Sequence, residues 1–282
     1  MTLEIRRLSG ALGADINGVN VAQMSDETFD DIHQALLDYG VIVIRDQNIT
    51  PGQQVEFAKR WNDVHTHPYL KGLDEHPEII EIVKEPHERG GFGAHWHTDQ
   101  IFTPAPAMAT MLYAKEVPEV GGDTMFASMH TAYAALSEGM QTMLRTVRTY
   151  NRYNKSAQRT GSMASKIPDK EVEADVACHP VVRLHPETKR PGLYVNDLEN
   201  TPRLDGWTED ESVPLLKFLL AHATKPEFTC RLRWEAGSLA IWDNRQVLHM
   251  ALNDYHGHRR VMHRITIQGD VPFGFEADAN AV

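Results

Sequence analysis

The run from Arg259 to Gly269, RRVMHRITIQG, alternates in the manner of a β-strand. Side chains two positions apart on a strand point to the same face. One face of this run would carry Arg260, Met262, Arg264 and Thr266. The opposite face is mainly apolar. Two arginines on one face would ordinarily lie in solvent, and a cavity is the alternative only where anions meet them. Arginine suits that second arrangement, because it binds carboxylates through two parallel hydrogen bonds.

Further short runs with the composition of strands lie upstream of this one. They cover residues 79–83, 108–117, 178–185, 192–195 and 238–243. Turn residues separate most of them, a pattern typical of an antiparallel sandwich or barrel rather than of repeated βαβ units. The sequence therefore predicts a mainly β fold with some helices.

The first sixty residues combine helix and strand signals. Ser25 precedes a helical apolar period that stops at Gly40, so a capped helix is expected there. A short buried strand is expected over residues 41–44. Thr50 is followed by a proline and then, three residues after the threonine, by a glutamine, the order of a capped helix start. The second helix should run toward Trp61.

The second half of the chain contains one more helix pattern and one long polar segment. Residues 209–223 predict a helix. Residues 150–176 hold few apolar side chains and no clean period, which is typical of a lid or binding loop within a compact domain. The length of 282 residues lies within the range of large all-β domains. Residues 1–282 are therefore predicted to form a single domain.

Composition narrows the class of protein. The formal net charge of −11 disfavours nucleic acid or an anionic membrane as partner, since both favour a basic face. The N-terminus lacks the apolar core of a signal peptide, and no apolar run approaches the roughly 18 residues of a membrane helix. Cys178 and Cys230 form no CxxC pair, which suits a reducing compartment. We expect a cytoplasmic enzyme or small-molecule binder.

A candidate metal site lies in Gly93–Gln100, GAHWHTDQ. On a strand His95, His97 and Asp99 would share one face. A histidine beside a carboxylate supplies two of the three ligands of the facial triad that holds Fe(II) and leaves positions open for co-substrate and oxygen. The distant second histidine would be His249, in WDNRQVLH after an apolar strand.

Other histidines need a different interpretation. The two His-x-Glu pairs, at His76 and His185, are interpreted as surface features in polar turn sequence. Trp96 and Trp242 are expected in the core, and His256 and His258 in an exposed turn. Two other classes stay open at this point. One is a zinc hydrolase whose ligands include His95 and His97, and the other is a binding protein with a β-sandwich fold and no activity.

Four motifs in order, WHTD, GGDT at Gly121–Thr124, WDNR…H and RR…HR, resemble the taurine dioxygenase family of Fe(II)/2-oxoglutarate-dependent oxygenases. The resemblance extends from about Ile5 to Pro272. It implies a double-stranded β-helix, or jelly roll, with flanking helices. It also implies that residues 1–282 form one catalytic domain, with 150–176 as the candidate lid.

The resemblance assigns roles to individual residues. It implies iron ligands at His97, Asp99 and His249. The distal carboxylate of 2-oxoglutarate would be held by Thr124 and Arg260. Arg264 would lie beside the other carboxylate of the co-substrate and an anionic group of the substrate. Further substrate contacts would come from His67, Gly93 and His95, although a packing role for His95 is an equal alternative.

The reaction implied is oxygenation, with Fe(II), 2-oxoglutarate and O2, of a small or medium organic anion such as a sulfonate, alkyl sulfate or aryloxyalkanoate. Succinate and CO2 are the co-products, and attack beside a heteroatom often cleaves the substrate. Leu70 and Gly93 stand where the taurine enzyme has a tyrosine and an asparagine, so a bulkier or more apolar anion is expected. The resemblance also allows a homo-oligomer, a dimer or a tetramer.

Overall fold

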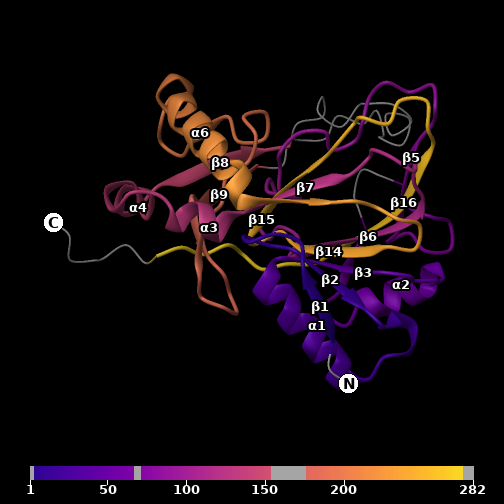
Figure 1. Cartoon of the computed structure of the whole chain (residues 1–282). Coiled ribbons are helices and arrows are strands. Elements are labelled where there is room, and N and C mark those ends of the chain that lie inside the picture. Colours follow the sequence, from indigo (N-terminus) through magenta and orange to yellow (C-terminus); the bar gives the residue numbers. More distant parts are fainter. Residues whose placement is uncertain (1–2, 67–70, 154–175, 276–282) are drawn as a thin grey trace.

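The computed structural model describes residues 3–66, 71–153 and 176–275 (Figure 1). The expected mainly β architecture is confirmed, with two facing sheets rolled into a jelly roll and helices on the outside. The strands are β1 (Glu4–Arg7), β2 (Ala14–Asn17), β3 (Val41–Ile44), β4 (Val64–His65), β5 (Ile80–Lys84), β6 (Ala109–Glu116), β7 (Thr124–Ser128), β8 (Arg148–Arg152), β9 (Val176–Pro180), β10 (Val182–Leu184), β11 (Pro191–Leu193), β12 (Arg203–Leu204), β13 (Thr229–Leu232), β14 (Leu239–Asp243), β15 (Val247–Ala251) and β16 (Arg260–Ile267). The helices are α1 (Asp26–Tyr39), α2 (Pro51–Ala58), α3 (Met129–Ala134), α4 (Glu138–Leu144) and α6 (Glu209–Ala223).

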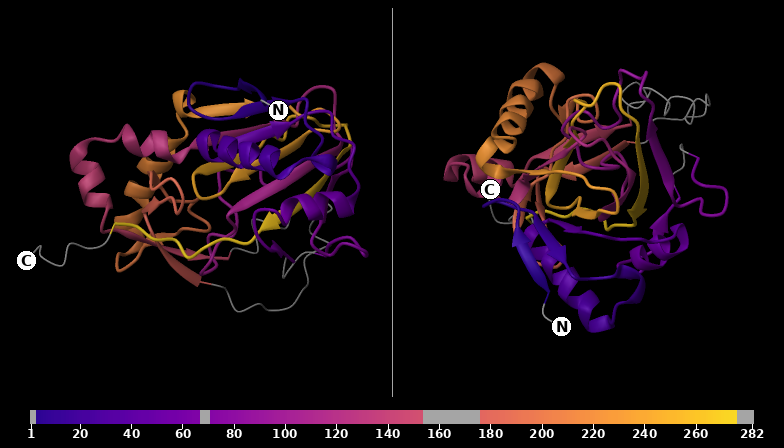
Figure 2. Two further views of the ribbon diagram at one scale, coloured as in Figure 1. Left: turned by 90° about the horizontal axis from the view of Figure 1, so that it is seen from below. Right: turned by 45° about the vertical axis from the view of Figure 1, so that its right-hand side comes forward.

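The largest sheet has the strand order β1-β2-β3-β14-β6-β16-β4, and β5 also pairs with β16. A smaller sheet has the order β13-β7-β15. Most neighbours are antiparallel, while β2 and β3 are parallel. In the right-hand view of Figure 2 the strands enclose an interior, with the N-terminal helices on one side and α6 on another.

The interior between the two sheets is apolar and includes Leu112, Phe126, Trp242 and Met262, all buried. These side chains come from β6, β7, β14 and β16, and alternation along each strand sends every second side chain inward. Arg260 and Arg264 lie on the same face of β16 as Met262, so the two cations also point into the roll. They are buried rather than solvated.

Helices α1 and α2 cover the outer face of the large sheet, as Figure 1 shows. Both begin where the sequence predicts. The Ser25 side chain caps α1, and Gly40 ends the helix in the left-handed conformation, with φ 71°. Glycine adopts that conformation without the steric cost of a Cβ. Thr50 and Gln53 form a reciprocal capping box on α2, although the helix ends at Ala58, before Trp61.

A second apolar core lies beneath α6, which spans the predicted residues 209–223. Leu216 and Leu219 are fully buried in it. The helix begins with a capping box between Thr208 and Glu211. No helix in the described part of the chain is long and apolar enough to cross a membrane.

The long polar segment predicted over residues 150–176 is β-strand rather than loop at both of its ends. Residues 150–152 belong to β8, and residue 176 begins β9, which pairs with β8. Residues 154–175, which hold most of the candidate lid, lie outside the described residues.

Candidate active site

The segment Gly93–Gln100 is irregular rather than the strand expected from the sequence. Gly93 and Gln100 both have positive φ, 71° and 56°, which interrupts extended backbone. One bridge holds the segment in place. His97 donates its backbone N–H to the carbonyl of His249 at 3.0 Å, and the reverse bond is 2.8 Å. This bridge brings together two histidines that are 152 positions apart in the sequence.

Three side chains that could hold a metal ion meet at this bridge: His97, Asp99 and His249. One ligand atom from each lies within 4.8 Å of the other two. The His97 Nδ1–H donates to the carbonyl of His95 at 2.7 Å, which leaves Nε2 free to face Asp99. Burial lowers the pKa of both histidines, so their neutral, ligating forms are favoured.

Asp99 is ionised despite its burial. Burial alone would raise its pKa, but the neighbouring Arg264 guanidinium and the hydrogen bond from Thr110 hold the pKa of this carboxyl well below its usual range. Arg264 lies 2.7 Å from Asp99 Oδ1. The hydroxyl of Thr110 donates to Oδ2 at 2.5 Å. Two imidazoles and a carboxylate of this kind form the donor set of a facial Fe(II) site.

The three side chains open onto a pocket of about 450 Å³, counted with its mouth, that is also lined by Thr124, Arg260 and Arg264. Arg260 Nε and Nη2 are buried and have no hydrogen-bond partner among the described residues. Burial lowers the pKa of Arg260. Trp234 Nε1–H, which can only donate, bonds to Thr124 Oγ1 at 3.0 Å, so the Thr124 hydroxyl proton is directed elsewhere. Buried, unpaired donors of this kind fit an anionic carboxylate.

The expected substrate contacts are only partly brought together. His67 and Leu70 lie outside the described residues. Gly93 lines the pocket, and a Cβ there would lie 3.2 Å from His97 Cε1. The His95 ring lies 4.8 Å from the His97 ring, but the side chain is 39% exposed and lies 3.7 Å from Asp197. Since His95 is absent from the cluster of ligand atoms, the geometry does not favour a zinc site built on it.

Sequence reasoning missed five residues of this site: Thr110 and four that line the pocket, Ile82, Phe92, Leu112 and Ala251. Thr110 is a polar interruption in the apolar run MATMLYA, which was the available signal. Trp242 lies in the core as expected, but it also lines the pocket. His256 and His258 are exposed, as predicted.

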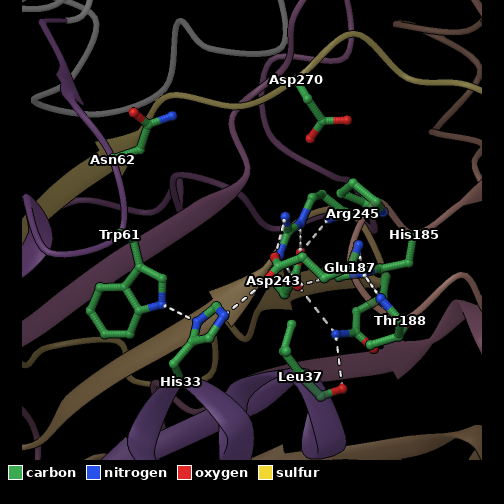
Figure 3. Close-up of polar contacts among 12 residues, drawn as sticks. His33, Leu37, Trp61, Asn62, His185, Glu187, Thr188, Asp243, Arg245 and Asp270 are labelled. Carbon is green, nitrogen blue, oxygen red and sulfur yellow. Dashed lines mark hydrogen bonds and ion pairs between the residues drawn. The ribbon is translucent and has the colours of Figure 1, made fainter. Parts of the chain in front are cut away.

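The prediction of His185 as a surface residue was wrong, whereas His76 is partly exposed. The His185 side chain is fully buried and donates from Nε2 to Asp243 Oδ2 at 2.9 Å. Asp243 also binds Arg245 through two oxygens, and Arg245 pairs with Glu187 at 2.9 Å (Figure 3). The buried imidazole of His185 therefore has its hydrogen-bond partner on a distant strand, as buried polar groups require.

A jelly roll with this pocket has the architecture of the 2-oxoglutarate-dependent dioxygenases. Residues 4–266 match the model of the taurine catabolism dioxygenase TauD, TfdA family, and the chain belongs to this family. It is 31% identical to an alkylsulfatase of Acinetobacter baylyi, over 96% of this chain and 87% of that protein. It is 30% identical to an (S)-phenoxypropionate/alpha-ketoglutarate-dioxygenase of Sphingobium herbicidovorans, over 95% of each.

Structural comparison agrees with the sequence comparison. The crystal structure of a taurine dioxygenase from Burkholderia xenovorans superposes with a TM-score of 0.82 and 33% identity, over 96% of this chain and 93% of that one. The protein is a 2-oxoglutarate-dependent dioxygenase, and the jelly-roll fold expected from the motifs is confirmed.

Proposed function

We propose that the pocket binds Fe(II) and 2-oxoglutarate and oxygenates a small or medium organic anion. The observation that carries the proposal is the convergence of three ligand atoms with two buried arginines in one pocket. The iron ligands are His97, Asp99 and His249. Thr124 and Arg260 hold the distal carboxylate of 2-oxoglutarate, and Arg264 lies beside the metal-binding end of the co-substrate and the anionic group of the substrate.

The bound iron, with 2-oxoglutarate and O2, supplies oxidation of a C–H bond together with release of succinate and CO2. The protein holds the metal and the co-substrate in position and excludes water from the pocket. His97 and His249 offer neutral nitrogens, while Arg260 fixes one end of the co-substrate by charge. The apolar pocket walls, Ile82 and Phe92 among them, exclude water from the reacting carbon.

Anaerobic titration with Fe(II) and 2-oxoglutarate, followed by visible absorption, tests this assignment. A weak charge-transfer band is expected for the wild type, because the co-substrate chelates the metal. His97→Ala should lose the band. The matched control is His95→Ala, which removes the neighbouring ring and should keep it. Loss of the band only in His95→Ala, or no band in folded wild-type protein, would favour the zinc hydrolase instead.

For the substrate, we propose an anion with a bulkier or more apolar body than taurine. The pocket wall beside Arg264 is apolar, because the guanidinium carbon of Arg264 lies 6.0 Å from the centre of the Phe92 ring. Gly93 adds no side chain next to His97, which leaves room there. Such a site suits a charged head on an apolar body, a description that fits the alkyl sulfates and aryloxyalkanoates.

A substrate panel with succinate formation as the readout tests the class. Medium-chain alkyl sulfates and aryloxypropionates should give higher kcat/KM than taurine. The matched control is the primary alcohol with the same alkyl chain, which lacks the charge and should react at least about 100-fold more slowly, because one desolvated arginine contact is worth roughly 3 kcal/mol. A preference for taurine would contradict the proposal.

We also propose that the protein acts in the cytoplasm. Both cysteines are unpaired, and burial raises the pKa of Cys230 to about 12. Free thiols of this kind are compatible with a reducing compartment.

A further inference from the structure

Thr110 is a fully buried residue of β6 that contacts the carboxylate of Asp99. On one side it pairs across the sheet with Trp242 of β14, and on the other with Thr266 of β16. A hydroxyl in the middle of an apolar sheet is unfavourable unless it makes hydrogen bonds. Thr110 makes two, and their direction can be derived from the chemistry of its neighbours.

The chain of hydrogen bonds begins at Trp242, which lines the pocket. The indole Nε1–H can only donate, and it bonds to Asn244 Oδ1 at 3.0 Å. Asn244 must therefore turn its Nδ2 group toward Thr110, where it donates to Oγ1 at 3.0 Å. With its oxygen accepting this bond, Thr110 directs its own hydrogen at Asp99 Oδ2. All four residues are buried, so water does not compete for these bonds.

Asn244 also contacts Thr98, the residue that precedes Asp99 in the sequence. The hydroxyl of Thr98, the residue between the two predicted ligands, donates to the backbone carbonyl of Asn244 at 2.9 Å. The carbonyl of Thr98 accepts from Asn196 Nδ2 at 3.1 Å. One residue, Asn244, is therefore connected to Asp99 through Thr110 and through the backbone next to Asp99.

The turn that carries Asn244 is fixed from its opposite side by the cluster in Figure 3. Asp243 accepts from the Arg245 backbone N–H at 2.9 Å and from Arg245 Nε at 2.8 Å. His185 closes the cluster from the loop that follows β10. The side chains of successive residues in this turn thus point in opposite directions. Asp243 and Arg245 face the buried cluster in Figure 3, and Asn244 faces Trp242 and Thr110.

We propose that Thr110 and Asn244 are positioning residues that orient the Asp99 carboxylate for metal binding, an inference that rests on the proposed iron site. Thr110 occupies one lone-pair direction of Oδ2 and leaves the others for the metal. Asn244 fixes the direction of the Thr110 hydroxyl. Partners that hold a metal ligand in this way typically change metal affinity about 10- to 100-fold when removed.

The test measures Mn(II) binding to the full chain without co-substrate, from the electron paramagnetic resonance signal of the free ion. Thr110→Val keeps the shape of the side chain and removes the donor, so its Kd should rise about 10- to 100-fold. Thr110→Ser restores the hydroxyl and should stay within about 3-fold of wild type. Asn244→Leu should show a smaller loss than Thr110→Val, because the threonine keeps its hydroxyl.

Thr266→Val is the matched control, since it removes a buried hydroxyl from the paired strand outside this chain of hydrogen bonds. Equal Kd values for Thr110→Val and wild type, or equal losses in Thr110→Val and Thr266→Val, would overturn the proposal. Wild-type Kd in Asn244→Leu would overturn the part assigned to Asn244. If Thr110→Val does not fold, Thr110→Ala against Thr110→Ser is judged by the same criterion. A wild type that fails to bind Mn(II) would overturn both the iron site and this inference.

Discussion

Replacing Arg245 by methionine should destabilise the fold without touching the predicted metal ligands. Arg245 is buried and pairs with Asp243 and Glu187. The Asp243 side chain is fully buried. Burial alone would raise the pKa of Asp243, but Arg245 and His185 hold it well below its usual range. In Arg245→Met this ionised carboxylate would keep only His185 and Gln246 as side-chain partners.

The size of the effect follows from the burial. Removing one partner of a buried ion pair costs about 3–5 kcal/mol. For a chain of this length, each kcal/mol lowers Tm by roughly 2–4 °C, so a fall of about 6–20 °C is expected. The matched control is Arg259→Met, which removes a cation that is 41% exposed and paired with Glu85 and Glu116. Exposed pairs of this kind contribute about 0–1 kcal/mol.

Urea unfolding gives the free energy of unfolding of both variants and thermal unfolding gives their Tm, each followed by tryptophan fluorescence. The double variant Asp243→Asn/Arg245→Met should be less destabilised than the sum of its single changes, because it removes the uncompensated charge together with its partner. If Arg245→Met loses no more stability than Arg259→Met, the cluster in Figure 3 does not hold the β14–β15 turn in the way described.

Three other predictions concern the pocket and the pH dependence of stability. Arg260→Leu should raise the Kd for 2-oxoglutarate at least about 100-fold in calorimetry, because the charge-assisted hydrogen bonds are lost. The same variant should bind Mn(II) as the wild type does. An unchanged Kd for 2-oxoglutarate would count against the role proposed for Arg260. Gly93→Ala should weaken Mn(II) binding, because its Cβ would crowd His97 Cε1 at 3.2 Å, whereas Gly257→Ala, with φ 84° but open space around it, should cost stability alone. Burial lowers the pKa of His179 to about 4, so this histidine favours the folded state above about pH 6.5 and loses that contribution as pH falls toward 4. In urea titrations His179→Gln should reduce the slope of stability against pH near pH 5 by about 1.4 kcal/mol per pH unit; an unchanged slope would refute this cause.

The sequence was sufficient to predict those features that depend on residues close to each other in the chain. Helix α1 is capped by Ser25 and Gly40, and each cap makes its hydrogen bond to a residue three or four positions away in the sequence. Helix α6 was predicted over its full length for the same reason. The β-strand alternation of β16 placed Arg260 and Arg264 on one face, and both do line the pocket.

Features that depend on distant partners could not be predicted in this way. The position of His97 comes from backbone bonds to His249, and the strand expected around it is broken by positive φ at Gly93 and Gln100. His185 looked like surface sequence because its partner, Asp243, is 58 positions away. Thr110 likewise acquires its role from Asn244, 134 positions away. The order of the motifs indicated the family, but not these contacts.

The position of both arginines on β16 has an evolutionary consequence. Their Cα atoms are four residues apart on one strand, and the strand repeat fixes that separation at about 13 Å. A shift of one residue would turn both guanidinium groups to the face occupied by Ile265, away from the pocket. The spacing of the two charges is therefore inherited with the sheet itself. New substrates can be accommodated by exchanges at Ile82, Phe92 and Gly93, which line the same pocket, while the strand that carries the two arginines stays the same.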